Sequence, residues 1–224
     1  MNIIKKNRSL LFLIVTMVIG VVLVGVLMFA ENSDIKGDEI IDNPPSQGFK
    51  ELENKINNLK NQNFDPTCYN TLSIEIDASF QSGLITNTVK NNLQSNLANV
   101  YSNLVYNQCE FYLTGNKINT STNILKWLQQ LETITSRNSK IDFYRSQIKA
   151  YDYYSEQFIN RVNSFCNTSE FDENVYSQLK TEANTMTKLN SKYKNNAKFN
   201  QIKQQSVAKL EIAYRRWAEQ DSEL

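Results

Sequence analysis

The sequence predicts an all-α protein, with an N-terminal single transmembrane helix followed by an irregular antiparallel helical bundle. Two observations lead to this prediction. The first is a run of about 21 uncharged residues from Leu10 to Ala30, which at 1.5 Å per helical residue is long enough to cross a bilayer. The second is that apolar residues recur at intervals of three and four almost throughout the chain from Phe49 onward, which is typical of helices with one buried face.

The apolar run at residues 10–30 is interpreted as a retained membrane anchor. A cleaved secretory signal is the alternative, but such signals have a shorter apolar region, and Met28 stands where cleavage favours a small residue. The run is preceded by three basic residues: Lys5, Lys6 and Arg8. Because basic residues stay on the cytoplasmic side, we expect residues 1–9 in the cytoplasm and the rest of the chain outside it.

The remainder of the chain is expected to be a flexible acidic linker at residues 31–48 and an extracytoplasmic helical domain at residues 49–224. The domain is long enough to bury a proper core. The chain has 24 Lys and Arg against 23 Asp and Glu, so no strong field attracts nucleic acid. Asn, Lys and Ile are abundant whereas Gly and Pro are scarce, a bias typical of AT-rich genomes, and we favour a bacterial envelope as the location.

The domain should begin with a short helix whose apolar stripe runs from Phe49 to Leu59. Asp65 and Pro66 then have the pattern of a helix start, as N-cap and first helical residue. The stretch TLSIEIDASFQ at residues 71–81 is ambiguous, because its apolar residues fit both the alternation of a strand and the spacing of a helix. We favour a helix, since no other segment alternates and a lone strand would leave its backbone groups unpaired.

Three helices are expected in the middle of the domain. A long one begins near Val89 and should end at Gly115, and a shorter one should follow the polar residues 119–121. Ser139 should cap the third, in which the four-three alternation of apolar residues is broken only at Ser155. The core residues predicted for these helices are Leu93, Leu97, Val100, Leu104, Ile124, Leu128, Leu131, Ile141, Tyr144, Ile148, Tyr151, Phe158, Val162 and Phe165.

Two more helices are expected at the C-terminal end. Asp172 should begin one that runs through Met186 to Tyr193, and the last should bury residues of the stripe Phe199, Ile202, Leu210, Ala213 and Trp217. Because the connections are short, neighbouring helices should pack antiparallel. An array of tetratricopeptide-like repeats is disfavoured, because the helix lengths differ and no motif recurs at a period of about 34 or 40 residues.

The chain contains no histidine. This excludes Ser-His-Asp and Cys-His nucleophile arrangements and the common imidazole metal ligands. We expect no catalytic, cofactor-binding or metal-binding residues, and therefore an interaction or scaffold domain anchored to the membrane and not an enzyme. The alternative is a His-independent enzyme that acts on an envelope polymer with carboxylates in a cleft between helices.

Three cysteines are present, and two of them are candidates for a disulfide. Cys109 and Cys166 each lie a similar number of residues beyond the expected start of a long helix. If the two long helices run parallel, both sulfurs reach the same end of the bundle, where a disulfide would join the helices. The alternative is that Cys68, Cys109 and Cys166 are all small buried apolar residues.

Two groups of residues are candidates for binding. Tyr151, Tyr153 and Tyr154 lie within one turn, as an aromatic surface or, with more weight, as core packing. Nine basic residues fall between positions 180 and 216 against two glutamates, a local net charge of +7 that is either a partner-binding face or a solvated surface. The partner-binding candidates are Lys192, Lys194, Lys198, Lys203, Arg215, Arg216 and Trp217. The expected partners are the lipid bilayer, through residues 10–30, and a protein or an envelope polymer.

Overall fold

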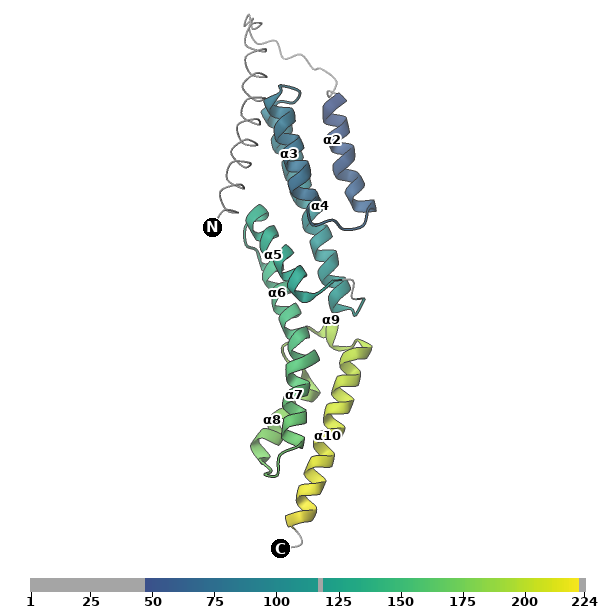
Figure 1. Ribbon diagram of the computed structural model, residues 1–224, viewed down its shortest axis with the longest axis vertical. Helices are drawn as coiled ribbons and strands as arrows, with labels where there is room; N and C mark the ends of the chain where they lie inside the picture. Colours follow the sequence, from purple (N-terminus) through teal and green to yellow (C-terminus); the bar gives the residue numbers. More distant parts are fainter. Residues whose placement is uncertain (1–46, 117–118, 222–224) are drawn as a thin grey trace, which may run out of the picture. The chain divides into compact units, whose positions relative to one another are not determined.

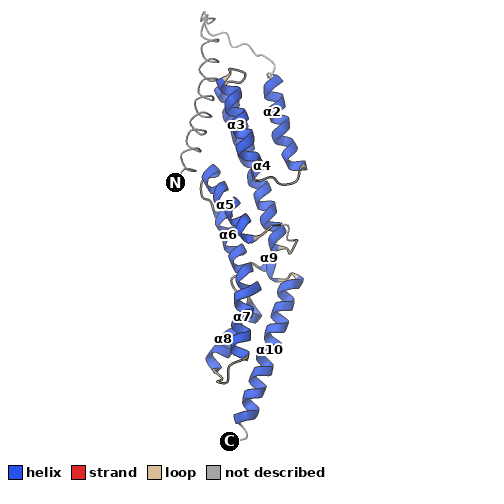
Figure 2. Ribbon diagram, viewed as in Figure 1, coloured by secondary structure: helices blue, strands red, loops and turns tan. Residues whose placement is uncertain are grey.

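A computed structural model of the chain describes residues 47–116 and 119–221. Every regular element within these residues is a helix (Figure 2), which confirms the all-α class predicted from the sequence. The chain divides between Pro44 and Pro45, and the described residues all belong to the second of the two units.

The membrane prediction needs a correction. No helix within residues 47–116 and 119–221 combines the length and the apolar character that a bilayer crossing requires. The predicted tail at residues 1–9, the anchor at residues 10–30 and nearly all of the predicted linker lie outside the described residues. The prediction of a single-pass membrane protein with an extracytoplasmic domain is therefore not supported, and it plays no part in the function proposed below.

The first three helices enclose a core of their own (Figure 1). These are α2 (Gln47–Asn58), which continues into a short 3₁₀ turn (Leu59–Asn61), α3 (Cys68–Gln81) and the first half of α4 (Asn87–Leu113). Helix α2 begins at Gln47, two residues before the predicted boundary at residue 49. The buried residues of this N-terminal core are Leu52, Ile56, Leu72, Ile76, Ile85, Leu93, Leu97 and Val100.

The ambiguous stretch at residues 71–81 is helical, as predicted, and its side chains show why. Leu72 and Ile76 are buried, whereas Ile74 is 69% exposed. A strand would place these three residues on the same face, whereas helical spacing separates Ile74 from the other two. The preceding Asp65 accepts hydrogen bonds from the backbone N–H and the hydroxyl of Thr67, so it closes a turn just before α3 and does not cap the helix itself.

The lengths of the next helices determine how the middle of the domain is arranged. Helix α4 has 27 residues, whereas α5 (Ser121–Thr135), which follows the predicted stop at Gly115, has 15. The chain therefore returns only about halfway along α4 before α6 (Ser139–Asp152) begins. Helix α6 then runs parallel to the second half of α4: Tyr144 stacks on Tyr106, and Tyr151 contacts Tyr112 farther along both helices.

The break in the apolar alternation at Ser155 coincides with a π-helical turn (Tyr153–Gln157) between α6 and α7 (Phe158–Cys166). A π turn inserts an extra residue into a continuous helix and changes which side chains face inward. Tyr154 is consequently buried within the turn, and Phe158 is buried just after it, so both sides of the break still present apolar residues to the core.

The C-terminal helices differ from the prediction at one point. Asp172 caps α8 (Glu173–Thr185) as expected, but this helix ends at Met186, which has a left-handed backbone conformation with φ of 40°. Tyr193 lies in a separate short helix, α9 (Ser191–Lys194), that precedes α10 (Ala197–Asp221). The predicted continuous helix to Tyr193 is wrong, because the chain leaves the helix after Thr185 and the loop that follows carries Met186 and Leu189 into the core.

A second core runs from the latter half of α4 to α10. The C-terminal part of α10 lies alongside α7 and α8 (Figure 1). We call α7, α8 and α10 together the C-terminal bundle. Helices α7 and α10 run parallel, since Asn163 of α7 contacts Lys209 and Cys166 contacts Arg216 farther along both helices. Of the residues predicted for the last helix, Phe199, Ile202, Leu210 and Ala213 are buried, whereas Trp217 is half-buried.

Candidate functional site

The three adjacent tyrosines do not form an aromatic surface. Tyr151 and Tyr154 are buried in the second core, and only Tyr153 reaches the surface. The Tyr153 hydroxyl donates to Glu182 at 2.9 Å and accepts from Arg161, while the Lys188 ammonium lies 3.3 Å from the centre of the Tyr153 ring. Tyr153 therefore joins the π turn to α8 within a network of charged side chains, and it offers no free stacking platform.

The three cysteines are free, so the predicted Cys109–Cys166 disulfide is absent from the structure. Helix α4 and the continuous α6–α7 helix do run parallel. However, α5 is short, so α6 begins only about halfway along α4, and the two long helices do not start at the same level. Cys109 lies near the level of Tyr144. The pKa of Tyr144 is raised mainly by burial, then by Glu110, and to a smaller extent by Cys109. Cys166 follows Tyr144 by about six helical turns on the continuous α6–α7 helix, or about 33 Å, which is far beyond the reach of a disulfide.

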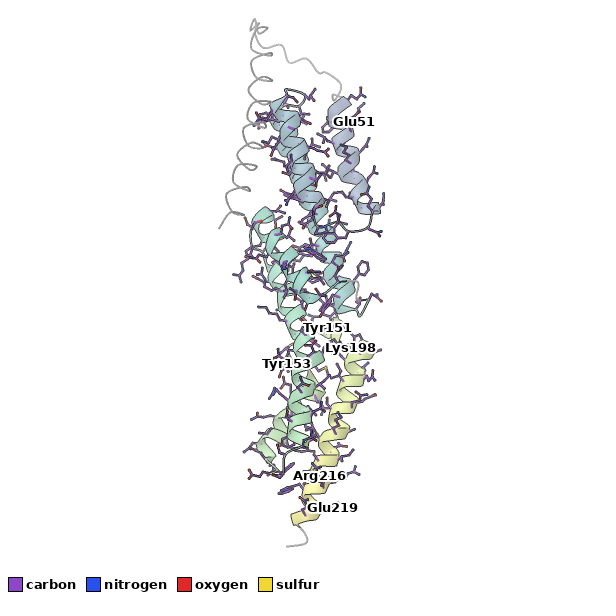
Figure 3. The ribbon with its side chains drawn as sticks, in the orientation of Figure 1. Glu51, Tyr151, Tyr153, Lys198, Arg216 and Glu219 are labelled. Atoms are coloured by element: carbon purple, nitrogen blue, oxygen red, sulfur yellow. The ribbon has the colours of Figure 1, made fainter. Side chains whose placement is uncertain are left out.

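Two residues of the predicted basic face, Lys192 and Lys198, contact side chains at the edge of the second core. Lys192 donates to the Glu110 carboxylate at 2.8 Å, and the same carboxylate accepts hydrogen bonds from Tyr144 at 2.7 Å and Tyr193 at 2.9 Å. Lys198 donates to Ser155 at 2.7 Å and lies 4.4 Å from the centre of the Tyr151 ring (Figure 3). These two ammonium groups connect α9 and α10 to α4, to α6 and to the π turn.

The seven partner-binding candidates do not form one surface. Lys192 and Lys194 lie on α9, and Lys198 lies in the first turn of α10. Arg216 is 18 residues farther along α10, or about 27 Å, near the other end of the helix (Figure 3). Lys203 lies between them and is half-buried. Arg215, Arg216 and Trp217 are consecutive near the end of α10 and form a group apart from the other four candidates.

Trp217 belongs to an aromatic cluster at the end of the C-terminal bundle, and Arg215 and Arg216 lie next to it in the sequence. Trp217 stacks on Phe171 of the α7–α8 loop, with ring centres 4.6 Å apart and planes at 24°. Tyr214 stacks on Tyr176 of α8, with ring centres 5.2 Å apart. Tyr214 is still 42% exposed, and Arg215 and Arg216 are exposed beside it. The packed rings thus hold the end of α10 against the α7–α8 loop.

A groove runs between α7 and α10 next to this cluster. Its widest part has a volume of about 510 Å³ and is lined by Asn163, Cys166, Asn167, Lys209, Ile212, Ala213 and Arg216. A narrower part continues toward the start of both helices and is lined by Ile159, Val162, Asn163, Ile202, Gln205, Ser206 and Lys209. The two parts share Asn163 and Lys209, so they adjoin each other along α7 and α10, and we refer to them together as the groove. Ile212, at its edge, is 65% exposed.

A second hollow, of about 490 Å³, lies between α7 and α8 and contains the carboxylates of Glu170 and Asp172. Asp172 accepts hydrogen bonds from the backbone N–H groups of Asn174 and Val175, at 2.9 and 3.1 Å, and so caps α8. Both hydrogen bonds are accepted by Oδ1 of Asp172, so this carboxylate has a structural role at the start of α8.

Sequence reasoning missed the residues that make this end of the molecule distinctive, namely Lys209, Ile212 and Tyr214 on α10 and Phe171 in the loop. A signal was available for two of them. The buried stripe of α10 contains Leu210 and Ala213, and Ile212 and Tyr214 fall outside it. Contiguous exposed apolar patches are typical of interaction surfaces, whereas single exposed apolar residues are common on any protein.

Comparisons of this chain with models of protein families, with curated proteins and with solved structures find no match.

Proposed function

We propose that this protein is a helical scaffold that binds a partner protein through the exposed residues at the end of α10. We call this set the C-terminal surface: Lys209, Ile212, Tyr214, Arg215, Arg216 and Trp217. The observation that supports the proposal most strongly is that Ile212 and Tyr214 remain exposed within one turn of two arginines. Aromatic residues and arginine are enriched at protein interfaces and dominate their binding energy.

The packing beneath this surface also favours binding. Trp217 and Tyr214 are each stacked on a ring of a neighbouring segment, so their side chains are already ordered. Binding through ordered side chains loses less conformational entropy than binding through mobile ones. The C-terminal surface is therefore suited to recognition by side chains whose positions are set before the partner arrives.

The shape of the surface supports recognition more than catalysis. The groove beside Ile212 is lined by apolar residues, amides and two cations, and it contains no carboxylate. General acid–base chemistry without histidine would need a carboxylate, lysine or tyrosine directed at a bound substrate. Lys209 is the only side chain of these three kinds that lines the groove, and one of its N–H groups donates to Asn163.

The experiment that tests the proposal places a photo-crosslinking amino acid at position 212 of the full chain in its native host. The matched control is position 74, because Ile74 is the same residue type and is equally exposed, but lies on α3 away from the C-terminal surface. We expect irradiation to give a discrete protein adduct at position 212, absent at position 74.

The same experiment in an Arg216→Glu background distinguishes recognition from adventitious contact. We expect the adduct at position 212 to be lost there, because the reversed charge faces the bound partner. Equal adducts at both positions, or an adduct at position 212 that Arg216→Glu leaves unchanged, would contradict the proposal.

A further inference from the structure

We infer that the groove between α7 and α10 binds an acidic amphipathic helix, which is the segment of the partner that this protein recognises. The inference rests on the proposed function and specifies the chemistry of the partner. It follows from the charges that line the groove, from their spacing along α10 and from the apolar side chain between them.

The charges that line the groove are all positive. Lys209 and Arg216 are its only ionisable side chains apart from the thiol of Cys166. Two glutamates on the same helix lie near these cations in the sequence, and neither lines the groove: Glu211 forms an ion pair at 3.6 Å with Lys180 of α8, and Glu219 follows Arg216 by three residues. Within residues 47–116 and 119–221, neither Lys209 nor Arg216 has an ion pair.

Both cations are held in place by neutral acceptors. The Lys209 ammonium donates to the side-chain oxygen of Asn163 at 2.7 Å, and the Arg216 guanidinium donates to the backbone carbonyl of Cys166 at 2.5 Å. An ammonium has three N–H donors and a guanidinium has five, so most donors on each remain available to a ligand. Carboxylates are the protein groups that pair most strongly with such fixed cations.

The spacing of the two cations indicates a helical ligand. Lys209 and Arg216 are seven residues apart on α10, or about 10.5 Å along its axis. A ligand helix places residues i and i+7 at the same separation on one face. An extended strand covers this distance in about three residues, whose side chains then point to opposite faces. Two carboxylates seven residues apart on one helix therefore match the spacing of Lys209 and Arg216 along α10, and the long side chains of these two residues make up the remaining difference.

The space between the cations is suited to apolar side chains. Ile212 and Ala213 lie between Lys209 and Arg216 and line the groove together with Cys166. A ligand helix with glutamates at i and i+7 and leucines at i+3 and i+4 would place its apolar residues against Ile212. This is the helix-in-groove mode of recognition, in which apolar anchors occupy a groove and flanking charges select the partner.

The probe for the test is a fluorescein-labelled synthetic helical peptide with glutamates at i and i+7 and leucines at i+3 and i+4. The control peptide has lysines in place of the two glutamates. We expect fluorescence anisotropy to give a Kd at least about tenfold lower for the glutamate peptide at low salt, and this preference should shrink as salt is added.

Cys166 provides a readout at the groove itself, because it lines the groove and is half-buried, whereas Cys68 and Cys109 are buried. Burial raises the pKa of the Cys166 thiol, an effect that nearby Lys209 and Arg216 oppose, so alkylation should be followed at mildly alkaline pH. We expect the glutamate peptide to slow alkylation of Cys166 by several-fold and the lysine peptide to leave the rate unchanged.

Variants complete the test. Ile212→Ser should weaken binding of the glutamate peptide by about tenfold, whereas the matched control Ile74→Ser should leave it unchanged. The double variant Lys209→Glu/Arg216→Glu should bind the lysine peptide in preference to the glutamate peptide, and its helical content by circular dichroism should match the parent. A gain of preference cannot result from misfolding.

Equal binding of the two peptides, no protection of Cys166, or equal effects of Ile212→Ser and Ile74→Ser would overturn the inference. These outcomes are distinguishable from failure of the proposed function. If position 212 still crosslinks to a partner in an Arg216-dependent manner while the glutamate peptide shows no preference, the surface binds a partner of another chemistry. If the crosslink is absent as well, the proposed function fails too.

Discussion

Glu110 shows how one carboxylate can join several helices. It lies on α4 and accepts hydrogen bonds from Tyr144 of α6 and from Lys192 and Tyr193 of α9. Burial by itself would raise the pKa of Glu110, but the hydrogen bonds from these three residues outweigh it and hold the pKa below the ordinary value of 4.5. The ionised carboxylate therefore stabilises the folded state.

Replacing Glu110 with Gln should lower the free energy of unfolding at pH 7 by about 1–2 kcal/mol, because hydrogen bonds to a charged group contribute more than those to an amide. Urea unfolding measures the change. The control is Glu156→Gln, since Glu156 is exposed in the π turn. If both variants lose the same free energy, the Glu110 network contributes nothing specific.

The same network predicts a pH dependence. The pKa of Glu110 is lowered in the folded state, so its contribution is fully present above the ordinary pKa of 4.5 and is lost as the pH falls through the folded-state value. The difference in unfolding free energy between the parent and Glu110→Gln should accordingly shrink between pH 6 and pH 3. A difference that stays constant over this range would contradict the assignment.

Ser136 has a backbone conformation that glycine adopts more readily. It lies in the exposed turn between α5 and α6, with φ of 63° and ψ of 160°. For a residue with a Cβ this region costs about 1–3 kcal/mol. We expect Ser136→Gly to raise the thermal midpoint in calorimetry and the control Ser136→Ala to leave it nearly unchanged, because alanine keeps the Cβ.

At the scale of single helices, the N-terminus of α8 depends on one side chain. Asp172 caps α8 through two backbone N–H groups, and it also ends the loop that carries Phe171 to the aromatic cluster. Asp172→Ala should cost about 0.5–2 kcal/mol of stability, whereas Glu173→Ala in the same turn should cost less. Chemical denaturation of both variants measures the difference, and equal losses would show that the cap is unimportant.

Helical spacing made most elements predictable, because it depends on residues close together in the sequence, and Ser155 was recognised as a break in the apolar pattern. Of the predicted caps, Asp172 is confirmed, whereas Asp65 and Ser139 are wrong, since Thr67 and Asn138 hold the N-cap positions of α3 and α6. The end of α8 at Met186 was not predicted, because Met186 is a large apolar residue in a left-handed conformation that local preferences disfavour. The cause is tertiary: Met186 and Leu189 are buried in the second core.

At the scale of the whole molecule, two separate cores share one helix. Helix α4 contributes Leu93 and Leu97 to the N-terminal core, and Cys109 and Leu113 to the second core. The burial that raises the pKa of Cys109 to about 12 shows how closely the latter half of α4 is enclosed. Each core can therefore loosen locally while α4 keeps the other intact.

This arrangement predicts a local response to a cavity. Ile76→Ala in the N-terminal core should lower stability by about 2–5 kcal/mol and increase hydrogen exchange in α2 and α3 more than in α7 and α10. Leu128→Ala, in the second core, serves as the counterpart and should leave α2 less affected. Uniform increases along the chain in both variants would indicate one cooperative unit.

The sequence by itself determined the helical class, most helix boundaries and many of the buried residues, because these depend on spacing and on preferences within a few residues. Leu104 and Trp217, which it placed in the core, are only half-buried, whereas Tyr101 and Val105 are buried without having been predicted. The tertiary structure alone decided which helices meet and at what register. Because α5 is shorter than α4, Cys109 and Cys166 lie far apart. The end of α8 at Met186 places Lys192 and Lys194 on the separate helix α9, away from Arg215 and Arg216 near the end of α10. The groove beside Lys209 and Arg216 exists only because α7 and α10 pack side by side, a contact between residues more than forty positions apart in the chain.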